Sequence, residues 1–283
     1  MTVLDRGKGP LGPLRCGITY VSGDFGDPDM ITDLLKSHDE VVDLAYATVP
    51  NTSFSDPLSD ILQNLPSAVQ LFKEAASIKK IRRLLFVSSG GTVYGDTNTL
   101  PIKEEFHTYP ISPYGVTKLT IEKYAYLYFA TQGLPVICLR HGNAFGEGQR
   151  PYSGQGFIAT AIASIMDGRP IQIYGQSGTV RDYIHAYDIA QAIVMALDKG
   201  VTGETYNVGS GIGLNNTEVI DAIMPHAQSC GYRVTTEHLP QRPFDVQRNV
   251  LDSTKLRKHT GWNQSIIFKA GIQRTWEWFI KKV

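Results

Sequence analysis

The chain has 283 residues, and its 27 basic side chains (Lys and Arg) balance 27 acidic ones (Asp and Glu), so its formal net charge at pH 7 is zero. An apolar share of 42% and a charged share of 19% are typical of a folded globular chain and argue against disorder. A neutral chain also lacks the charge excess that drives binding to nucleic acid or to a membrane surface.

The sequence also lacks the patterns of a membrane-spanning helix, a signal peptide, a disulfide framework and a cysteine metal site. The longest apolar stretch, residues 157–166, is shorter than the roughly 20 residues that a membrane-spanning helix needs. The first ten residues lack the basic and then apolar pattern of a signal peptide, so we expect a cytoplasmic protein. Cys16, Cys138 and Cys230 are widely spaced and odd in number, and they predict neither a disulfide framework nor a metal site.

Short apolar, β-rich runs alternate with helical patterns along most of the chain. In chain order we expect strands over 2–4, 18–21, 41–45, 84–88, 135–139 and 204–208, and helices over 28–36, 60–78, 113–131, 156–167 and 186–198. Strands separated by helices are typical of a parallel sheet with helices on both faces. The sequence therefore predicts an α/β protein with a doubly wound, Rossmann-type parallel sheet.

The character of the sequence changes after about residue 142, where Gly, Pro and Gln interrupt the segment GNAFGEGQRPYSGQG (142–156). Strand signals become scarcer beyond this point. We therefore expect the chain to leave its first domain here and to build a part that covers the substrate. It would return briefly to the first domain through the helix at 186–198 and the strand at 204–208.

A glycine pattern near the N-terminus, GKGPLG (7–12), has the spacing of a dinucleotide-binding turn. Such a turn opens a helix, but Pro10 and Pro13 stand where the helix would begin, so we interpret the segment as a loop between two strands. Asp5 ends the preceding strand, where such folds place an acid on the ribose hydroxyls of an adenine nucleotide. On this interpretation residues 1–5 are the second strand of the nucleotide fold, and the first strand, glycine loop and first helix are absent. From Asp5 alone, a surface acid in a turn is the simpler interpretation.

Two segments bring together the groups of a proton-transfer site. LFVSSGGTVYGD (85–96) is a buried strand that runs into hydroxyl- and glycine-rich residues, and SPYGVTKLTIEKY (112–124) begins a helix that carries Tyr114 and Lys118. Residues four apart share a helix face, so the phenol and the ammonium can reach the same small volume. A nearby cation favours the phenolate, and we therefore expect the Tyr114 pKa to lie below its usual value, in the working range of a general base.

Four later segments complete the pattern: RHGNAFGEGQ (140–149), VRDYIHAYDIA (180–190), TYNVGSG (205–211) and RPFDVQRNVLD (242–252). Together the motifs resemble the extended short-chain dehydrogenase/reductase superfamily, and most closely its NAD-dependent nucleotide-sugar epimerase/dehydratase family, which includes the UDP-glucose/UDP-galactose 4-epimerases. The resemblance runs from Met1 almost to the C-terminus. It implies NAD as cofactor, an NAD-binding domain of residues 1–142 plus 183–208, and a smaller α/β nucleotide-sugar domain of residues 143–182 plus 209–283.

The resemblance also implies roles for individual residues. Tyr114 is similar to the base that takes the proton from the sugar hydroxyl, and Lys118 to the residue that binds the nicotinamide ribose and tunes that tyrosine. Asp5 and Asp24 are similar to the acids that contact the adenosine of NAD. The residues that resemble nucleotide-sugar ligands are Asn143, Arg181 and Arg242 at the diphosphate, Asp245 near the nucleotide ribose, and Asn249 at a position thought to set pocket size.

The chain departs from the family pattern in three places. Gly90 stands where the family usually has a catalytic Ser or Thr, so Ser89 or Thr92 would supply the hydroxyl. We prefer Thr92, because the pleat of a strand would place it on the same side as residue 90. Dehydratases and decarboxylases of the family carry a carboxylate at the position of Thr92, so its hydroxyl favours epimerisation over elimination. The third departure is the missing N-terminal glycine motif.

The missing first strand would lie in the middle of such a sheet. Without it two buried strand edges lose a partner, at a cost of about 1–3 kcal/mol for each unpaired group. We therefore expect that the given start is too late, from a misplaced start codon or a truncated gene. The alternative is a real truncated, inactive or differently folded product.

The sequence thus predicts a cytoplasmic, NAD-dependent epimerase that acts at C4 of a UDP-hexose or UDP-N-acetylhexosamine through a transient 4-keto sugar. The resemblance implies a homodimer paired through the helices at 60–78 and 113–131, with no metal, nucleic acid or membrane partner. One alternative is a dehydratase or reductase of the same superfamily. The other is an inactive homologue that binds sugar nucleotides through Asn143, Arg181 and Arg242 but cannot hold NAD.

Overall fold

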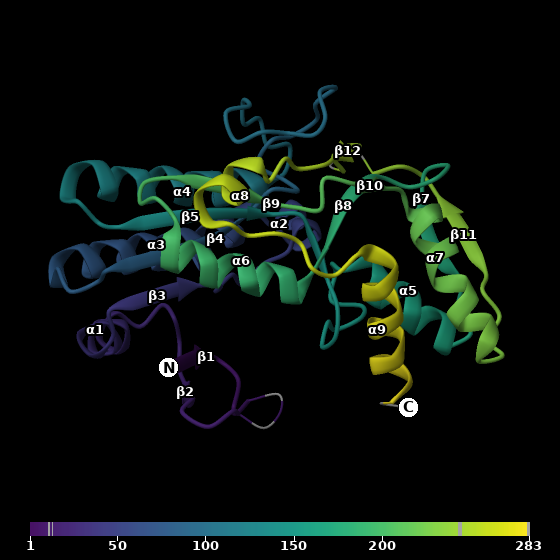
Figure 1. The fold of residues 1–283 in the computed structure, drawn as a ribbon, viewed down its shortest axis with the longest axis horizontal. Helices are drawn as coiled ribbons and strands as arrows, with labels where there is room; N and C mark the ends of the chain where they lie inside the picture. The colour runs from purple at the N-terminus through teal and green to yellow at the C-terminus, as the bar shows by residue number, and fades with distance from the viewer. Residues whose placement is uncertain (11, 13, 243–244, 282–283) are drawn as a thin grey trace.

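A four-stranded parallel sheet forms the centre of the larger part of the molecule. The computed structural model describes residues 1–10, 12, 14–242 and 245–281, so Pro13, the Pro243–Phe244 pair of the last motif and the end of the expected second domain lie outside the described residues. The sheet consists of β3 (Glu40–Asp43), β4 (Arg83–Ser89), β5 (Val136–His141) and β9 (Thr205–Val208), side by side in that order (Figure 1). These are the last four of the six expected strands, and the predicted α/β class is confirmed.

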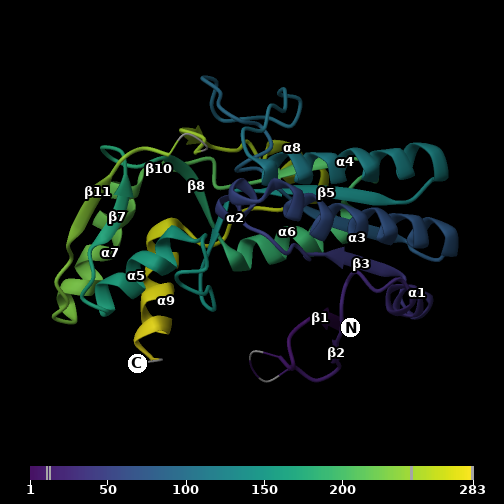
Figure 2. The same cartoon turned by 180° about the vertical axis from the view of Figure 1, so that it is seen from behind.

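Helices cover both faces of this sheet, as a doubly wound fold requires (Figures 1 and 2). On one face lie α1 (Pro28–Ser37), α3 (Pro57–Ile78) and α4 (Pro113–Gln132), and on the other α6 (Ala186–Lys199) and α8 (Thr254–Thr260). Along β4, Leu84 and Phe86 are buried in the cluster with α3 and α4, whereas Leu85 and Val87 are buried in the cluster with α6. A strand covered on both faces needs apolar residues at successive positions, which explains the continuous apolar run in the sequence.

Side-chain caps mark the starts of the two long helices, and the start and end of α4 agree with its predicted caps. Asp56 accepts a hydrogen bond from the Ser59 nitrogen at 2.9 Å at the start of α3, and Ser112 accepts one from the Gly115 nitrogen at 3.2 Å at the start of α4. α4 ends at Gly133, whose φ of 70° lies in the left-handed region that favours glycine. Among the described residues, no helix combines the length and the apolar character needed to cross a membrane.

The first two strands form a separate ladder. β1 (Thr2–Asp5) and β2 (Thr19–Ser22) pair in parallel, and in the described part of the chain neither of them pairs with β3 (Figures 1 and 2). Beside the free edge of β3, Val42 is 37% exposed and Leu44 is 64% exposed. The sheet is therefore interrupted between β1 and β3, where the expected fold has its first strand.

The smaller part contains short strands that the sequence analysis did not anticipate. β8 (Val180–His185) pairs with β6 (Asn143–Phe145), β10 (Gly213–Leu214) and β12 (Arg248–Asn249), and β7 (Ile171–Tyr174) pairs with β11 (Thr236–Leu239). The other elements here are α5 (Phe157–Met166), α7 (Asn216–Ser229) and α9 (Phe268–Ile280). The expectation of few strands beyond residue 142 is wrong: β6, β10 and β12 have only two or three residues, too few to show alternation, and the longer β7, β8 and β11 were overlooked.

One C-terminal segment returns to the larger sheet. Trp262, just after α8, is completely buried in the cluster formed by α6, β4, β5 and β9, and its indole nitrogen donates to the Asp188 carbonyl at 3.0 Å. Residues 254–262 thus pack on the larger sheet, although they fall in the range expected for the substrate domain. The short helix α2 (Pro50–Ser55), which precedes α3, was also not expected.

Candidate functional site

The candidate site lies at the carboxyl end of β4, next to the start of α4. Open α/β sheets bind ligands outside the carboxyl ends of their strands, and Ser89 is the last residue of β4. The half-buried Tyr114 is the second residue of α4, its backbone nitrogen donates to Ser53 Oγ at 3.1 Å, and its phenol lies close enough to Ser89 for that side chain to act on its pKa. The fold thus joins the two segments that the sequence analysis placed in one site.

The ammonium of Lys118 is buried and points to the backbone of β4. Its Nζ donates to the Val87 carbonyl at 2.8 Å, and lies 4.1 Å from the centre of the Tyr46 ring but 6.0 Å from the centre of the Tyr114 ring. The Tyr46 ring packs edge-on against Tyr114, with centroids 4.8 Å apart and planes at 68°. Of these two tyrosines, the one closer to the ammonium is therefore Tyr46, which the sequence analysis did not single out.

These surroundings raise the pKa of Tyr114. Burial is the largest cause, the charge of Asp60 acts in the same direction, and the hydrogen bond with Ser89 opposes both. The expectation that Lys118 lowers the Tyr114 pKa is therefore wrong for this state of the site, because the ammonium lies against Tyr46 instead.

Buried carboxylates surround the Lys118 ammonium. Burial lowers the pKa of Lys118 to about 8, against the opposing charges of Asp43, Glu122 and Asp60. Asp43 ends β3, and burial raises its pKa to about 6. Its Oδ1 accepts a hydrogen bond from the Ala45 nitrogen at 3.0 Å, but within the described residues Oδ2 has no hydrogen-bond partner. A buried oxygen without a partner at the end of a strand is a place where a ligand could donate a hydrogen bond.

Asp43 and Tyr46 were both missed at the sequence level. The available signal was their position, since they stand at the end of the expected strand 41–45, at the edge of the sheet that binds ligands.

The path of the loop after β4 bears on the choice between Ser89 and Thr92 as the hydroxyl of the site. The strand ends at Ser89, and the backbone then turns, with the Thr92 nitrogen 3.5 Å from the Ser89 carbonyl. The pleat argument for Thr92 is therefore wrong, and of the two hydroxyls Ser89 is the one that acts on the Tyr114 pKa. A Cβ on Gly90 would lie 2.9 Å from the Arg140 carbonyl oxygen, which explains why no larger residue stands there.

Two of the predicted substrate residues flank this loop. Asn249 is 1% exposed and its Nδ2 donates to the Gly90 carbonyl at 2.8 Å, so it supports the loop from behind. A Cβ on Gly91 would lie 3.4 Å from Asn143 Oδ1 and 4.0 Å from Ser89 Oγ, so both side chains lie next to this glycine of the loop.

The other three predicted substrate residues lie further along the smaller part. Arg181 stands opposite Asn249 in the ladder of β8 and β12. Arg242 pairs with Asp245 at 2.8 Å and lies 4.1 Å over the ring of Tyr174. Burial lowers the pKa of Arg181, and the charges of Asp245 and Arg242 act on it in opposite directions, so the three groups are neighbours.

The two predicted adenosine-binding acids lie on the separate β1–β2 piece. Asp24 pairs with Arg6 at 2.8 Å, and its pKa is lowered by hydrogen bonds from the Gly26 backbone and from Arg6. Asp5 accepts a hydrogen bond from the Gly7 nitrogen at 2.7 Å. Both carboxylates are exposed and are not brought together with Tyr114.

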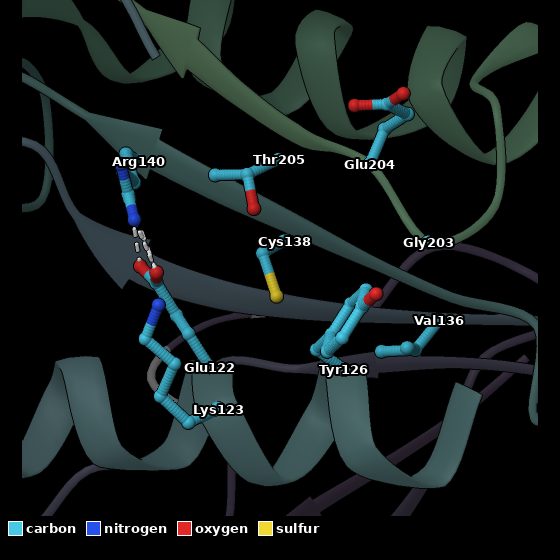
Figure 3. A pocket seen from close by; sticks show the side chains of 9 residues that line it. All are labelled: Glu122, Lys123, Tyr126, Val136, Cys138, Arg140, Gly203, Glu204 and Thr205. Carbon is cyan, nitrogen blue, oxygen red and sulfur yellow. Dashed lines mark hydrogen bonds and ion pairs between the residues drawn. The ribbon is translucent and has the colours of Figure 1, made fainter. Parts of the chain in front are cut away.

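A cavity of about 230 Å³ lies away from this site, between α4, β5 and the start of β9 (Figure 3). Arg140 and Glu122 form a buried ion pair at its edge, with Nη2 and Oε2 2.6 Å apart. Ser88 donates to the same carboxylate at 2.5 Å, and Arg140 donates to the Tyr94 hydroxyl at 2.9 Å. Because these buried charges satisfy each other, the pair joins α4 to the sheet, and we assign the cavity no role in the site.

A Rossmann-type sheet that brings a Tyr and a Ser together beside a buried Lys at its carboxyl edge is typical of a nucleotide-dependent enzyme of the short-chain dehydrogenase/reductase type. The family model described as NAD dependent epimerase/dehydratase family matches residues 2–209. The chain therefore belongs to this family, and the predicted family and fold are confirmed. The expected cofactor, NAD, is confirmed for the family, whose description names it.

Relatives of two activities are similar to this chain. A dTDP-glucose 4,6-dehydratase of Streptomyces niveus is 31% identical over 99% of this chain and 83% of the relative. A UDP-glucose 4-epimerase of Mycolicibacterium smegmatis is 31% identical over 93% of this chain and 83% of the relative. Among solved structures, the UDP-glucose 4-epimerase of Thermus thermophilus in complex with NAD has a TM-score of 0.90 at 30% identity, and the match covers 100% of this chain and 91% of that one.

Proposed function

We propose that the chain is an NAD-dependent epimerase that inverts C4 of a UDP-hexose or UDP-N-acetylhexosamine, with Tyr114 as the base and the cytoplasm as its location. The observation that carries the proposal is the meeting of Tyr114, at the start of α4, with Ser89 and the buried Lys118 at the carboxyl end of β4, where the Lys118 ammonium lies 6.0 Å from the centre of the Tyr114 ring. The similarity to 4-epimerases of other organisms supports it.

The residues at this edge of the sheet fit a nicotinamide nucleotide. Asp43 Oδ2 and Thr92 Oγ1 are buried and have no partner within the described residues, as expected for atoms that a bound ligand would satisfy. Lys118 would contact the nicotinamide ribose, and Asp5 and Asp24 the adenosine. When bound, NAD supplies reversible hydride transfer, through which the sugar passes as a transient 4-keto form without net oxidation.

The side chains of this protein would bind the sugar nucleotide and move its proton. Tyr114 takes the proton of the C4 hydroxyl and returns it, while Ser89 holds that hydroxyl against the phenol. The forked donors of Arg181 and Arg242 suit the diphosphate. In this proposal residues 1–142 plus 183–208 bind NAD and residues 143–182 plus 209–283 bind the sugar nucleotide, so the reacting carbon lies between them.

Product analysis by NMR tests the reaction. Purified protein with NAD and UDP-glucose should give a mixture of the two C4 epimers. Tyr114→Phe should lower turnover by about 10²- to 10⁴-fold, because it removes the proton acceptor, while calorimetry still detects UDP-sugar binding. Tyr124→Phe, on the same helix, is the matched control and should keep wild-type turnover. Unchanged turnover in Tyr114→Phe would refute the assigned base.

A 4,6-dehydratase is the second candidate, favoured by the identity with the Streptomyces niveus relative. Thr92 argues against it, since a hydroxyl cannot replace the carboxylate that elimination needs. A 4-keto-6-deoxy product from dTDP-glucose or UDP-glucose would establish the dehydratase. Binding of UDP-sugar without NAD binding or turnover would instead indicate an inactive homologue.

A homodimer paired through α3 and α4 completes the proposal. Both helices expose large apolar side chains: Leu58 and Leu62 are 64% and 60% exposed on α3, and Val116 and Leu127 are 49% and 47% exposed on α4. Such a surface is favourable to cover with a second copy. Light scattering should give twice the 31.2 kDa of the chain, and Leu62→Glu should give the monomer. A wild-type monomer at micromolar concentration would refute the dimer.

A further inference from the structure

The ring of Tyr46 packs against both Lys118 and Tyr114. It lies 4.1 Å from the Lys118 ammonium and 4.8 Å, centroid to centroid, from the Tyr114 ring, while the ammonium is 6.0 Å from the centre of the Tyr114 ring. Lys118 itself is 4% exposed. The Tyr46 ring is therefore the nearer of the two tyrosine rings to the ammonium and packs on one side of it.

The Tyr46 side chain is held mainly through its ring, which packs on the Lys118 ammonium and edge-on against Tyr114, and the backbone beside it is well fixed. Its hydroxyl lies 3.4 Å from each carboxylate oxygen of Asp60, which is at the long end of hydrogen-bond geometry. By contrast, the Ala47 nitrogen donates to Asn64 Oδ1 at 2.7 Å, and the Ala45 nitrogen donates to Asp43 at 3.0 Å. Turning the ring about its own side-chain bonds would break its contacts with Lys118 and Tyr114 but would leave the backbone hydrogen bonds of the loop in place.

We propose that Tyr46 is a positioning residue that controls access to Lys118: its ring covers the ammonium, and a ligand hydroxyl can contact that ammonium only after the ring has turned away. The proposal rests on the proposed function, because it takes the incoming ligand to be a nicotinamide nucleotide. The conformation with the ring over Lys118 is then the one that cannot bind the cofactor. The apparent affinity for NAD equals the intrinsic affinity multiplied by the fraction of molecules in which the ring is turned away.

Chemical labelling of Lys118 tests the cover without any cofactor. Burial lowers the Lys118 pKa to about 8, so at pH 8 about half of the amine is unprotonated and access limits its acetylation. Peptide mass spectrometry gives the acetylation rate of Lys118 relative to Lys36, which is 63% exposed. We expect Tyr46→Ala to raise this ratio at least tenfold and Tyr46→Phe, which keeps the ring, to leave it within about twofold. Tyr187→Ala is the control, since Tyr187 is 48% exposed on α6, on the other face of the sheet.

The labelling result is decisive in either direction. If Tyr46→Ala leaves the Lys118-to-Lys36 acetylation ratio unchanged, or if Tyr46→Phe raises it as much as Tyr46→Ala does, the ring of Tyr46 does not limit access to Lys118 and the proposal is wrong. Should Tyr46→Ala fail to fold by circular dichroism, Tyr46→Leu removes the ring but keeps apolar bulk, and the same tenfold rise is expected.

Titration with NAD tests the consequence for the cofactor. Tyr46→Ala should bind NAD about tenfold more tightly than wild type, about 1.4 kcal/mol, and lower its KM while kcat stays within about threefold. Equal NAD affinity in wild type and Tyr46→Ala overturns the control of access. If the labelling ratio rises as expected but no variant binds NAD, the proposed function fails while the cover over Lys118 stands.

Discussion

Replacing Asp43 by Asn should stabilise the protein in a pH-dependent way. Burial raises the pKa of this carboxyl from 3.8 to about 6, despite the opposing charge of Lys118, so the folded chain holds the Asp43 proton more tightly than the unfolded chain. Below about pH 4 the carboxyl is protonated in both states. As the pH rises from about 4 through 6, the folded state loses stability, because the charge must then form in a buried place.

The size of the effect follows from the two pKa values. Raising a pKa by about two units corresponds to about 3 kcal/mol of unfolding free energy, which wild type loses across that window. The Asn variant has no such loss, so its advantage over wild type should grow by about 1–3 kcal/mol between pH 4 and pH 7. The smaller value allows for Lys118, whose ammonium loses a neighbouring negative charge in the variant.

Urea unfolding followed by circular dichroism at several pH values between 4 and 7 measures this difference. Comparing variant and wild type at each pH removes the contributions of all other titrating groups, provided that they are unaffected by the change. Asp33→Asn is the control, because the Asp33 side chain is 78% exposed and its removal should give no comparable pH dependence. A difference that is constant across the range, or that shrinks as the pH rises, would refute the reasoning.

Two further substitutions probe the packing around the site. Glu122→Gln leaves the Arg140 guanidinium buried without its counter-charge, and denaturant unfolding should show a loss of about 3–5 kcal/mol; a loss below about 1 kcal/mol would contradict a buried ion pair. Gly90→Ala would place a Cβ 2.9 Å from the Arg140 carbonyl oxygen and against Leu251 Cδ1, so thermal unfolding should show a loss of about 1–3 kcal/mol. Gly91→Ala, whose closest contact would be at 3.4 Å, is the matched comparison, and an equal effect of both changes would contradict the argument.

Elements that depend on local sequence signals could be predicted from the sequence alone. The run at 84–88 is apolar at successive positions, and Ser112 with Pro113 marks the start of α4, so both elements lie close to where they were predicted. The strands β10 and β12 have two residues each and are set by pairing with β8, which no local pattern contains.

The site was predictable in its residues but not in their orientation. Ser89 and Tyr114 meet as the two motifs suggested. The placement of Lys118 against Tyr46 depends on the path of the loop after β3 and on Asp60 in α3, which are distant from α4 in the sequence. The strand geometry assumed for Thr92 is wrong, because the sequence does not reveal that β4 stops at Ser89, and the choice between the two hydroxyls stays a prediction.

The ladder of β1 and β2 gives the molecule two levels of local stability. Of residues 1–26, as far as they are described, Leu4 and Phe25 pack against the apolar cluster between the larger sheet and the helices α1, α3 and α4. A segment with so few buried apolar contacts opens at a lower free energy than a strand buried on both faces. Amide protons of β1 and β2 should therefore exchange with solvent through local opening, while those of β4 wait for global unfolding.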